Sequence, residues 1–194
     1  MQPSIDMKNT VEQIFLESIA VKQETLKKNL TAIISAAELI ISALKSGHKL
    51  FFCGNGGSAA DSQHIAAEFV GRFQKERKAW PAIALTTDSS ALTALGNDYT
   101  FDIVFSRPLQ ALGQKGDVLI AISTSGNSKN VLEAVRQAKL MGISTIAVTG
   151  AKGGQLAGLC DIAIIAASSK TARIQESHLV IFHSICELVE NTLA

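Results

Sequence analysis

Five short apolar runs follow one another along the chain, and stretches of helix-forming residues separate them. The runs are Leu50–Cys53, Ala82–Leu85, Val118–Ile122, Thr145–Val148 and Ile162–Ile165. Apolar and polar residues do not alternate within the runs, which indicates strands that are buried on both faces. Such strands, separated by helices, are typical of a parallel sheet covered by helices on both sides. The sequence therefore predicts an α/β fold with five parallel strands and a ligand site at their carboxyl ends.

Long helices are predicted at both ends of the chain. Residues 10–44 contain no glycine or proline and predict one or two long helices that end at residues 45–47. The second half of this segment has apolar residues on much more than one stripe of a helix: Ile33, Ile34, Ala37, Leu39, Ile40, Ile41 and Leu44. Burial on more than one side is therefore expected, with a partner subunit as a natural second neighbour. Residues 173–192 also have helical apolar spacing and are expected to pack against the core or another subunit.

Size and charge limit the classes of protein to which the chain can belong. A chain of 194 residues with 47% hydrophobic composition can bury one full core, so a single domain is expected over residues 1–194. We expect residues 1–46 to form an N-terminal helical oligomerisation segment and residues 47–194 an α/β core. The net charge of +1 favours neither a nucleic acid nor a membrane as partner. The charged run Lys75–Lys78 is interpreted as a solvated helix end.

The cysteines and the first residues indicate the cellular compartment. Cys53, Cys160 and Cys186 lie far apart, which fits neither a disulfide framework nor a clustered thiolate metal site and favours a reducing cytoplasm. Residues 1–6 lack the features of a signal peptide, and no apolar run approaches the length of a membrane span. A soluble cytoplasmic protein is expected.

Two glycine- and serine-rich turns follow predicted strands and precede predicted helices. The first is Gly54-Asn55-Gly56-Gly57-Ser58, and the second is Ser123-Thr124-Ser125-Gly126-Asn127-Ser128. Backbone N–H groups and the helix dipole make an anion site at such a junction. The lysine pattern of polyphosphate loops and the glycine pattern of dinucleotide loops are both missing. These turns therefore predict a binder of phosphorylated small molecules, for which sugars are candidates.

Two polar groups on predicted helices are candidates for chemistry. His64 and Glu68 are four residues apart and share one helix face, so they could be metal ligands or a proton-transfer pair. The spacing alone favours a simple hydrogen-bonded pair. The last helix carries a second polar group: Gln175, Glu176, His178 and His183. Its spacing does not choose between the two histidines, and residues facing solvent or an interface explain the group equally well.

Other polar and small residues have structural interpretations. Gly96-Asn97-Asp98 is predicted to be a short polar turn after the helical residues 90–95, and Asp61 and Asp88 are expected to support helix starts. Cys53 is expected to be a small buried residue, and Trp80-Pro81 to pack at the entrance of a strand.

Taken together, the motifs resemble the sugar isomerase (SIS) domain family, and within it the phosphoheptose isomerases. They are Cys53–Ser58, His64 with Glu68, Gly96–Asp98, Ile122–Ser128, and Arg173–Glu176 followed by His183. The resemblance runs from the N-terminal helices to the final helix. It implies a flavodoxin-like three-layer sandwich, with N-terminal helices that pack into a homotetramer. Some family members carry an aspartate where this chain has Ala172, which puts a secondary polar contact in question.

The resemblance also implies roles for individual residues. The phosphate would be held by Ser123, Thr124, Ser125 and Ser128. The sugar chain would be contacted, or the pocket lined, by Asn55, Gly56, Gly57, Ser58, Asn97 and Asp98, and Gln175 would touch substrate or metal. A zinc ion would be bound by His64, Glu68, Gln175 and His183. Because Gln175 and His183 would be about 12 Å apart at Cα in a straight helix, they share one ion only if the glutamine reaches back or the helix starts late.

The implied reaction converts sedoheptulose 7-phosphate to D-glycero-D-manno-heptose 7-phosphate through an enediol, as part of heptose supply for the lipopolysaccharide core. Glu68, which also contacts substrate, would be the base and His183 the acid or proton shuttle, and zinc would polarise the carbonyl. Two alternatives remain open: a non-enzymatic relative that binds the replication initiator protein, and a sugar-phosphate sensor. The regulator type tends to lose the catalytic carboxylate and histidine, so the presence of Glu68 and His183 favours the enzyme.

Overall fold

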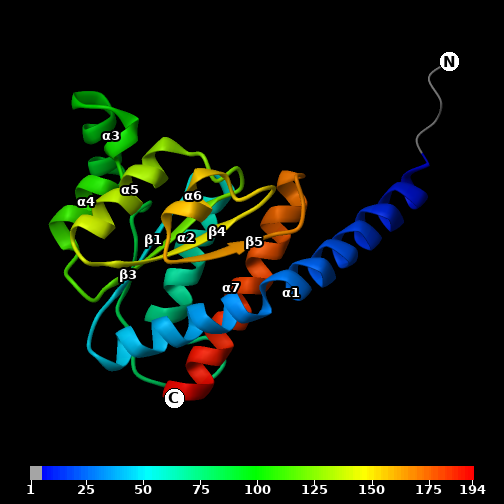
Figure 1. The fold of residues 1–194 in the computed structure, drawn as a ribbon, viewed down its shortest axis with the longest axis horizontal. Coiled ribbons are helices and arrows are strands. Elements are labelled where there is room, and N and C mark those ends of the chain that lie inside the picture. Colours follow the sequence, from blue (N-terminus) through cyan, green and yellow to red (C-terminus); the bar gives the residue numbers. More distant parts are fainter. Residues whose placement is uncertain (1–5) are drawn as a thin grey trace.

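The computed structural model describes residues 6–194, so the expectation about a signal peptide lies outside the described residues except at Asp6. Its centre is a parallel five-stranded sheet with the order β2-β1-β3-β4-β5 (Figure 1). The strands are β1 (Leu50–Cys53), β2 (Ala82–Ala84), β3 (Val118–Ser123), β4 (Ser144–Thr149) and β5 (Ile162–Ile165). The five predicted strands are thus confirmed, and their order is the flavodoxin-like one.

Helices cover both faces of the sheet (Figure 1). They are α1 (Met7–Lys45), α2 (Gly57–Val70), α3 (Ser89–Asp98), the 3₁₀ turn η1 (Phe101–Ile103), α4 (Ser106–Leu112), α5 (Lys129–Leu140), α6 (Gly154–Leu159) and α7 (Thr171–Leu193). Leu50 and Phe52 of β1 join a cluster with α1, α2 and α7, whereas Phe51 and the buried Cys53 join one with α4, α5 and α6. Because successive strand residues point to opposite faces, unalternating apolar strands produce this three-layer arrangement.

The N-terminal segment is one continuous helix, α1, of 39 residues. Its second half packs against α7 and β5, whereas its first half projects away from the body (Figure 1). The Asn29 side chain donates to the Ile165 carbonyl oxygen and accepts from the Ile165 N–H, both at 2.9 Å. It thereby satisfies main-chain groups at the edge strand β5. Ile34, expected among the buried residues, stays 43% exposed in the single chain.

The strand order places the two glycine- and serine-rich loops side by side. The loop after β1 leads into α2 and the loop after β3 leads into α5, while β1 and β3 are hydrogen-bonded neighbours. The chain proceeds from β1 to one edge of the sheet and from β3 to the other, so these loops flank the point where the order reverses. Ligands of open α/β sheets bind at such a point. None of the helices in residues 6–194 has the length and apolar character that a membrane span needs.

Candidate active site

The serine loop between β3 and α5 gathers its hydroxyl groups on one side. Ser123 Oγ lies 3.1 Å from Ser128 Oγ and 3.5 Å from Ser125 Oγ. Thr124 is half-buried in the same loop. Ser128 is the N-cap residue of α5, yet its hydroxyl faces Ser123 instead of capping the helix. Neutral hydroxyl donors at a helix N-terminus suit the binding of an anion.

Gly126 allows this loop to pack closely against its neighbour. Its φ of +66° lies in the left-handed region, and a Cβ at this position would overlap the carbonyl oxygen of Gly153. A residue with a side chain is therefore excluded on two grounds.

The glycine loop between β1 and α2 contacts both the start of α5 and α7. Asn55 and Asn130 exchange two amide hydrogen bonds of 2.9 Å, which join the glycine loop to the first turn of α5. Ser58 is buried, whereas Gly56 and Gly57 are exposed. Asn130 was not identified from the sequence. The signal available in the sequence was an amide side chain two residues after Ser128, in the first turn of the predicted helix.

Gln175 lies against the start of α2. A Cβ on Gly57 would overlap Gln175 Nε2, so the side chain occupies the space that the glycine leaves. The helix α7 starts at Thr171 and is continuous to Leu193, so Gln175 and His183 share it and a late helix start is excluded. Ala172, three residues before Gln175 on α7, is exposed.

A second cluster lies between α2 and α7. His64 Nε2 is 3.0 Å from Glu68 Oε1, and the His64 and His183 rings meet edge to face with centroids 5.3 Å apart. One ligand atom from each of the three residues lies within 4.8 Å of the others. His183 Nε2 is buried and has no hydrogen-bond partner among residues 6–194. Two imidazoles and a carboxylate with an unpaired buried nitrogen fit the donor set of a zinc ion.

His178 lies outside this cluster. It is 0% exposed, and its Nε2 donates to the Thr149 carbonyl oxygen at 3.0 Å. Burial lowers the pKa of His178 to about 4. The structure therefore brings His183, and not His178, to the cluster of His64 and Glu68.

Asn97 and Asp98 do not form the expected turn, because they lie in the last turn of α3. Their side chains are exposed, and Asn97 Nδ2 donates to Asp98 Oδ1 at 2.8 Å. No other side-chain hydrogen bond involves them within the described part of the chain. The helix continues through Gly96 because one glycine costs only about 1 kcal/mol relative to alanine.

The two aspartates expected at helix starts differ. Asp88 accepts the Ala91 N–H at 2.9 Å and caps α3, which confirms the prediction. For Asp61 the prediction is wrong, because Gly56 is the N-cap of α2 and Asp61 lies inside the helix. Burial raises the pKa of Asp61, while the nearby His64 acts in the opposite direction.

The interpretation of residues 75–78 as a helix end is also wrong, and so is the expected solvation of Arg77, whereas Lys75, Glu76 and Lys78 are exposed as expected. These residues lie in a loop after α2, and the Arg77 side chain is 4% exposed and paired with Glu190 of α7. The ring of Trp80, buried as expected, stacks on the Arg77 guanidinium. A buried acid near the end of an amphipathic helix gives no sequence signal that distinguishes it from a surface charge.

Comparisons with known proteins agree with this architecture. Residues 14–150 match the model of the SIS domain family. The phosphoheptose isomerase of Aliarcobacter butzleri is 49% identical over 191 residues, which cover 97% of this chain and 100% of the relative. That of Aquifex aeolicus is 52% identical and covers 95% of this chain and 96% of its own length.

Solved structures give the same result. The phosphoheptose isomerase of Neisseria gonorrhoeae superposes with a TM-score of 0.91 at 46% identity, covering 95% of this chain and 99% of that one. The enzyme of Francisella tularensis has a TM-score of 0.93 at 37% identity, covering 96% and 100%. The chain therefore belongs to the SIS domain family and, within it, to the phosphoheptose isomerases.

Proposed function

We propose that this chain interconverts sedoheptulose 7-phosphate and D-glycero-D-manno-heptose 7-phosphate, in the supply of heptose for the lipopolysaccharide core. The observation that carries the proposal is the cluster of His64, Glu68 and His183, which lies on α2, the helix that leaves the glycine loop, and on α7. Relatives that cover nearly the whole chain are named for this activity. They give no support to the alternative of a replication regulator.

The serine loop would hold the phosphate end of the substrate. Ser123, Thr124, Ser125 and Ser128 offer hydroxyl donors, to which the first turn of α5 adds its dipole. The sugar chain would then be contacted by Asn55, Gly56, Gly57, Ser58 and Gln175, with the exposed Asn97 and Asp98 as further proposed contacts. Fixing the phosphate orients the carbonyl end of the substrate toward α2 and α7.

Glu68 and His183 would move the protons. Glu68 removes a proton from C1 of the ketose while His183 donates one to the carbonyl oxygen at C2, and an enediol results. Loss of the proton on the C1 oxygen and return of a proton to C2 then complete the aldose. One side-chain ligand atom of Glu68 lies within 4.8 Å of one of His183, which supports joint action on neighbouring atoms of one substrate.

We further propose that one zinc ion per subunit binds at this cluster. His64, Glu68 and His183 would hold it, and Gln175 would be the fourth ligand if its side chain reaches back from Gly57. Bound zinc would supply a Lewis acid for the substrate carbonyl. Glu68 has two carboxylate oxygens, so one can face the ion and the other the substrate proton.

We also propose a single domain that assembles into a homotetramer through α1. Large apolar side chains are exposed along this helix: Val11, Ile14, Phe15, Leu16, Ile19, Leu26 and Leu30. A groove of about 300 Å³ between α1 and α7 continues this surface. Contiguous apolar surface of this kind marks protein interfaces. The three free cysteines support a reducing, cytoplasmic location.

The test is product formation from sedoheptulose 7-phosphate by purified protein, with and without zinc. We expect Glu68→Gln and His183→Ala each to lower kcat at least about 100-fold, while Glu187→Gln, an exposed acid on α7, stays at the wild-type rate. Absence of conversion by correctly folded wild-type protein under both metal conditions would refute the proposed function.

A further inference from the structure

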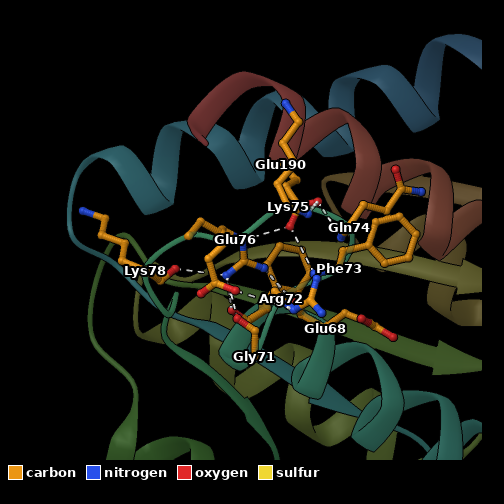
Figure 2. Close-up of polar contacts among 11 residues, drawn as sticks. Glu68, Gly71, Arg72, Phe73, Gln74, Lys75, Glu76, Lys78 and Glu190 are labelled. Carbon is orange, nitrogen blue, oxygen red and sulfur yellow. Dashed lines mark hydrogen bonds and ion pairs between the residues drawn. The ribbon is translucent and has the colours of Figure 1, made fainter.

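A buried ion pair outside the His64, Glu68 and His183 cluster joins the loop after α2 to α7. The side chains of Arg77 and Glu190 are 4% and 2% exposed, with Nε 3.1 Å from Oε1. The Glu190 carboxylate also accepts the N–H groups of Phe73, Gln74 and Lys75 at 3.1, 2.7 and 2.9 Å. Figure 2 shows the Glu190 side chain pointing from α7 toward these amides. We call Arg77, Glu190 and the three amides the clasp.

The surroundings of Glu190 favour the negatively charged form of its side chain. Burial alone would raise the pKa of Glu190, but the hydrogen bonds from the three amides and Arg77 outweigh burial and hold the pKa below its ordinary value. The carboxylate is therefore ionised at neutral pH. Charge-assisted hydrogen bonds of this kind are roughly twice as strong as neutral ones.

One arm of the clasp holds the main chain of Glu68. Arg77 Nη2 donates to the Glu68 carbonyl oxygen at 2.7 Å, and Nη1 donates to those of Phe69 and Gly71 at 2.9 and 3.1 Å. The guanidinium carbon lies 3.6 Å from the centroid of the Trp80 ring, which fixes its plane. Carbonyl groups in the last turn of a helix lack hydrogen-bond donors inside the helix. Arg77 supplies such a donor to the carbonyl of Glu68, the residue that carries the proposed base.

The other arm reaches His183. The N–H of Phe73 is bound by Glu190, and the Phe73 ring lies 5.4 Å from the His183 ring at an interplanar angle of 37°. Glu190 follows His183 by seven residues, so both project from the same face of α7. The clasp therefore contacts the main chain of Glu68 through Arg77, and it holds the residue, Phe73, whose ring lies against His183.

We propose that the clasp is a positioning device that sets the Glu68 carboxylate against the His183 imidazole. The inference rests on the proposed function of these two residues. Arg77 and Glu190 do not touch the reacting atoms and act through the main chain of Glu68 and the ring of Phe73. Proton transfer is sensitive to such placement, since an error of about 1 Å can cost about 100-fold in rate.

The central test variant is Glu190→Gln, which keeps the shape of the side chain and removes its charge. We expect kcat to fall about 10- to 100-fold, with KM for sedoheptulose 7-phosphate changed by less than about threefold. We also expect the NMR signals of the His183 ring to shift in the substrate-free and metal-free protein, because the Phe73 ring moves. The matched control is Glu133→Gln, which discharges the exposed Glu133–Arg136 pair on α5 and should change neither readout.

Phe73→Leu separates positioning from folding. It leaves the N–H that Glu190 binds and removes only the ring against His183, so kcat should fall while the protein stays folded. If Glu190→Gln does not fold, this variant decides, and an unchanged kcat overturns the inference.

The outcomes are distinguishable from failure of the proposed function. With an active wild type, a folded Glu190→Gln that keeps either kcat or the His183 signals overturns the inference. If the wild type has no turnover, the proposed function fails, and the His183 signals alone decide whether the clasp places this residue. Unchanged NMR signals of the His183 ring in Glu190→Gln would show that the clasp does not position His183, and shifted signals would support that it does.

Discussion

Two histidines five residues apart on α7 have opposite surroundings. His178 is fully buried, and its ring donates to the Thr149 carbonyl oxygen at the end of β4. His183 is half-buried between the rings of Phe73 and His64. Five residues turn a helix by about 140°, so one ring faces the sheet and the other faces α2. The orientation of α7 thus decides which histidine is available for chemistry.

The low pKa of His178 predicts how the stability of the protein depends on pH. Burial lowers it from 6.5 to about 4, so the unfolded chain binds a proton between these pH values and the folded chain does not. The contribution of His178 to the free energy of unfolding is therefore fully present above pH 6.5. It is lost as the pH falls toward 4, and the loss amounts to roughly 3 kcal/mol. His178→Gln should show a smaller loss of unfolding free energy in urea titrations between pH 7 and pH 4.5. Equal losses in both proteins would contradict this origin.

Among the elements, the packing of α2 on α7 brings the polar groups together. The two helices meet at Gly57 with Gln175, at the His64, Glu68 and His183 cluster, and through the clasp. Local sequence makes each helix amphipathic, but the contact between them depends on their placement on the same face of the sheet. The site therefore belongs to the pair of helices, and neither carries it alone.

Gly57→Ala tests this contact. The new Cβ would overlap Gln175 Nε2, the end of a flexible side chain, so the glutamine should turn away while the fold stays intact. We expect the unfolding free energy to stay within about 1 kcal/mol of wild type, with kcat/KM and zinc affinity each lowered about 10- to 100-fold. Gly126→Ala is the comparison, since its Cβ would meet main chain at a φ of +66°. It should lose stability by at least about 1 kcal/mol, and equal stability of the two variants would argue against this distinction.

At the scale of the whole molecule, the first half of α1 contacts α7 through polar groups, for example where Arg173 donates to the Ile14 carbonyl oxygen at 2.7 Å, but its large apolar side chains stay exposed. Phe15 is 66% exposed and Ile19 is 51% exposed, and the two are one helical turn apart. Apolar side chains in such numbers are unfavourable in water unless another surface covers them. The proposed homotetramer provides that cover without changing the α/β core.

Phe15→Glu combined with Ile19→Glu should dissociate the assembly. Multi-angle light scattering should show a lower mass than wild type at the same concentration, and circular dichroism should show unchanged helix content, because neither residue is in the core. Thr10→Glu with Gln13→Glu is the matched control on the same helix and should retain the wild-type mass. A double variant of Phe15 and Ile19 that keeps the wild-type mass would remove α1 from the interface.

Most of the fold could be predicted, because its elements have local causes. The strands were found within about a residue of their ends, for example β2, which stops at Ala84 and not at Leu85. The serine loop and the pair His64 and Glu68 could also be found, since spacing along one segment decides them. The prediction of a turn at Asn97 was wrong because a single glycine is a weak stop signal, and α3 continues through it to Asp98.

The sequence by itself determined the strands, the helices, the two loops and the chemical types available at the sheet edge, all of which depend on neighbours along the chain. Helical spacing did not choose between His178 and His183; the family resemblance implied His183, and the packing of α7 on α2 is what brings it to Glu68. Only the tertiary structure decided that Asn55 meets Asn130 across 75 residues and that Arg77 meets Glu190 across 113. A buried charge and a surface charge are identical in sequence. Their difference comes from the desolvation and hydrogen bonding that long-range packing imposes.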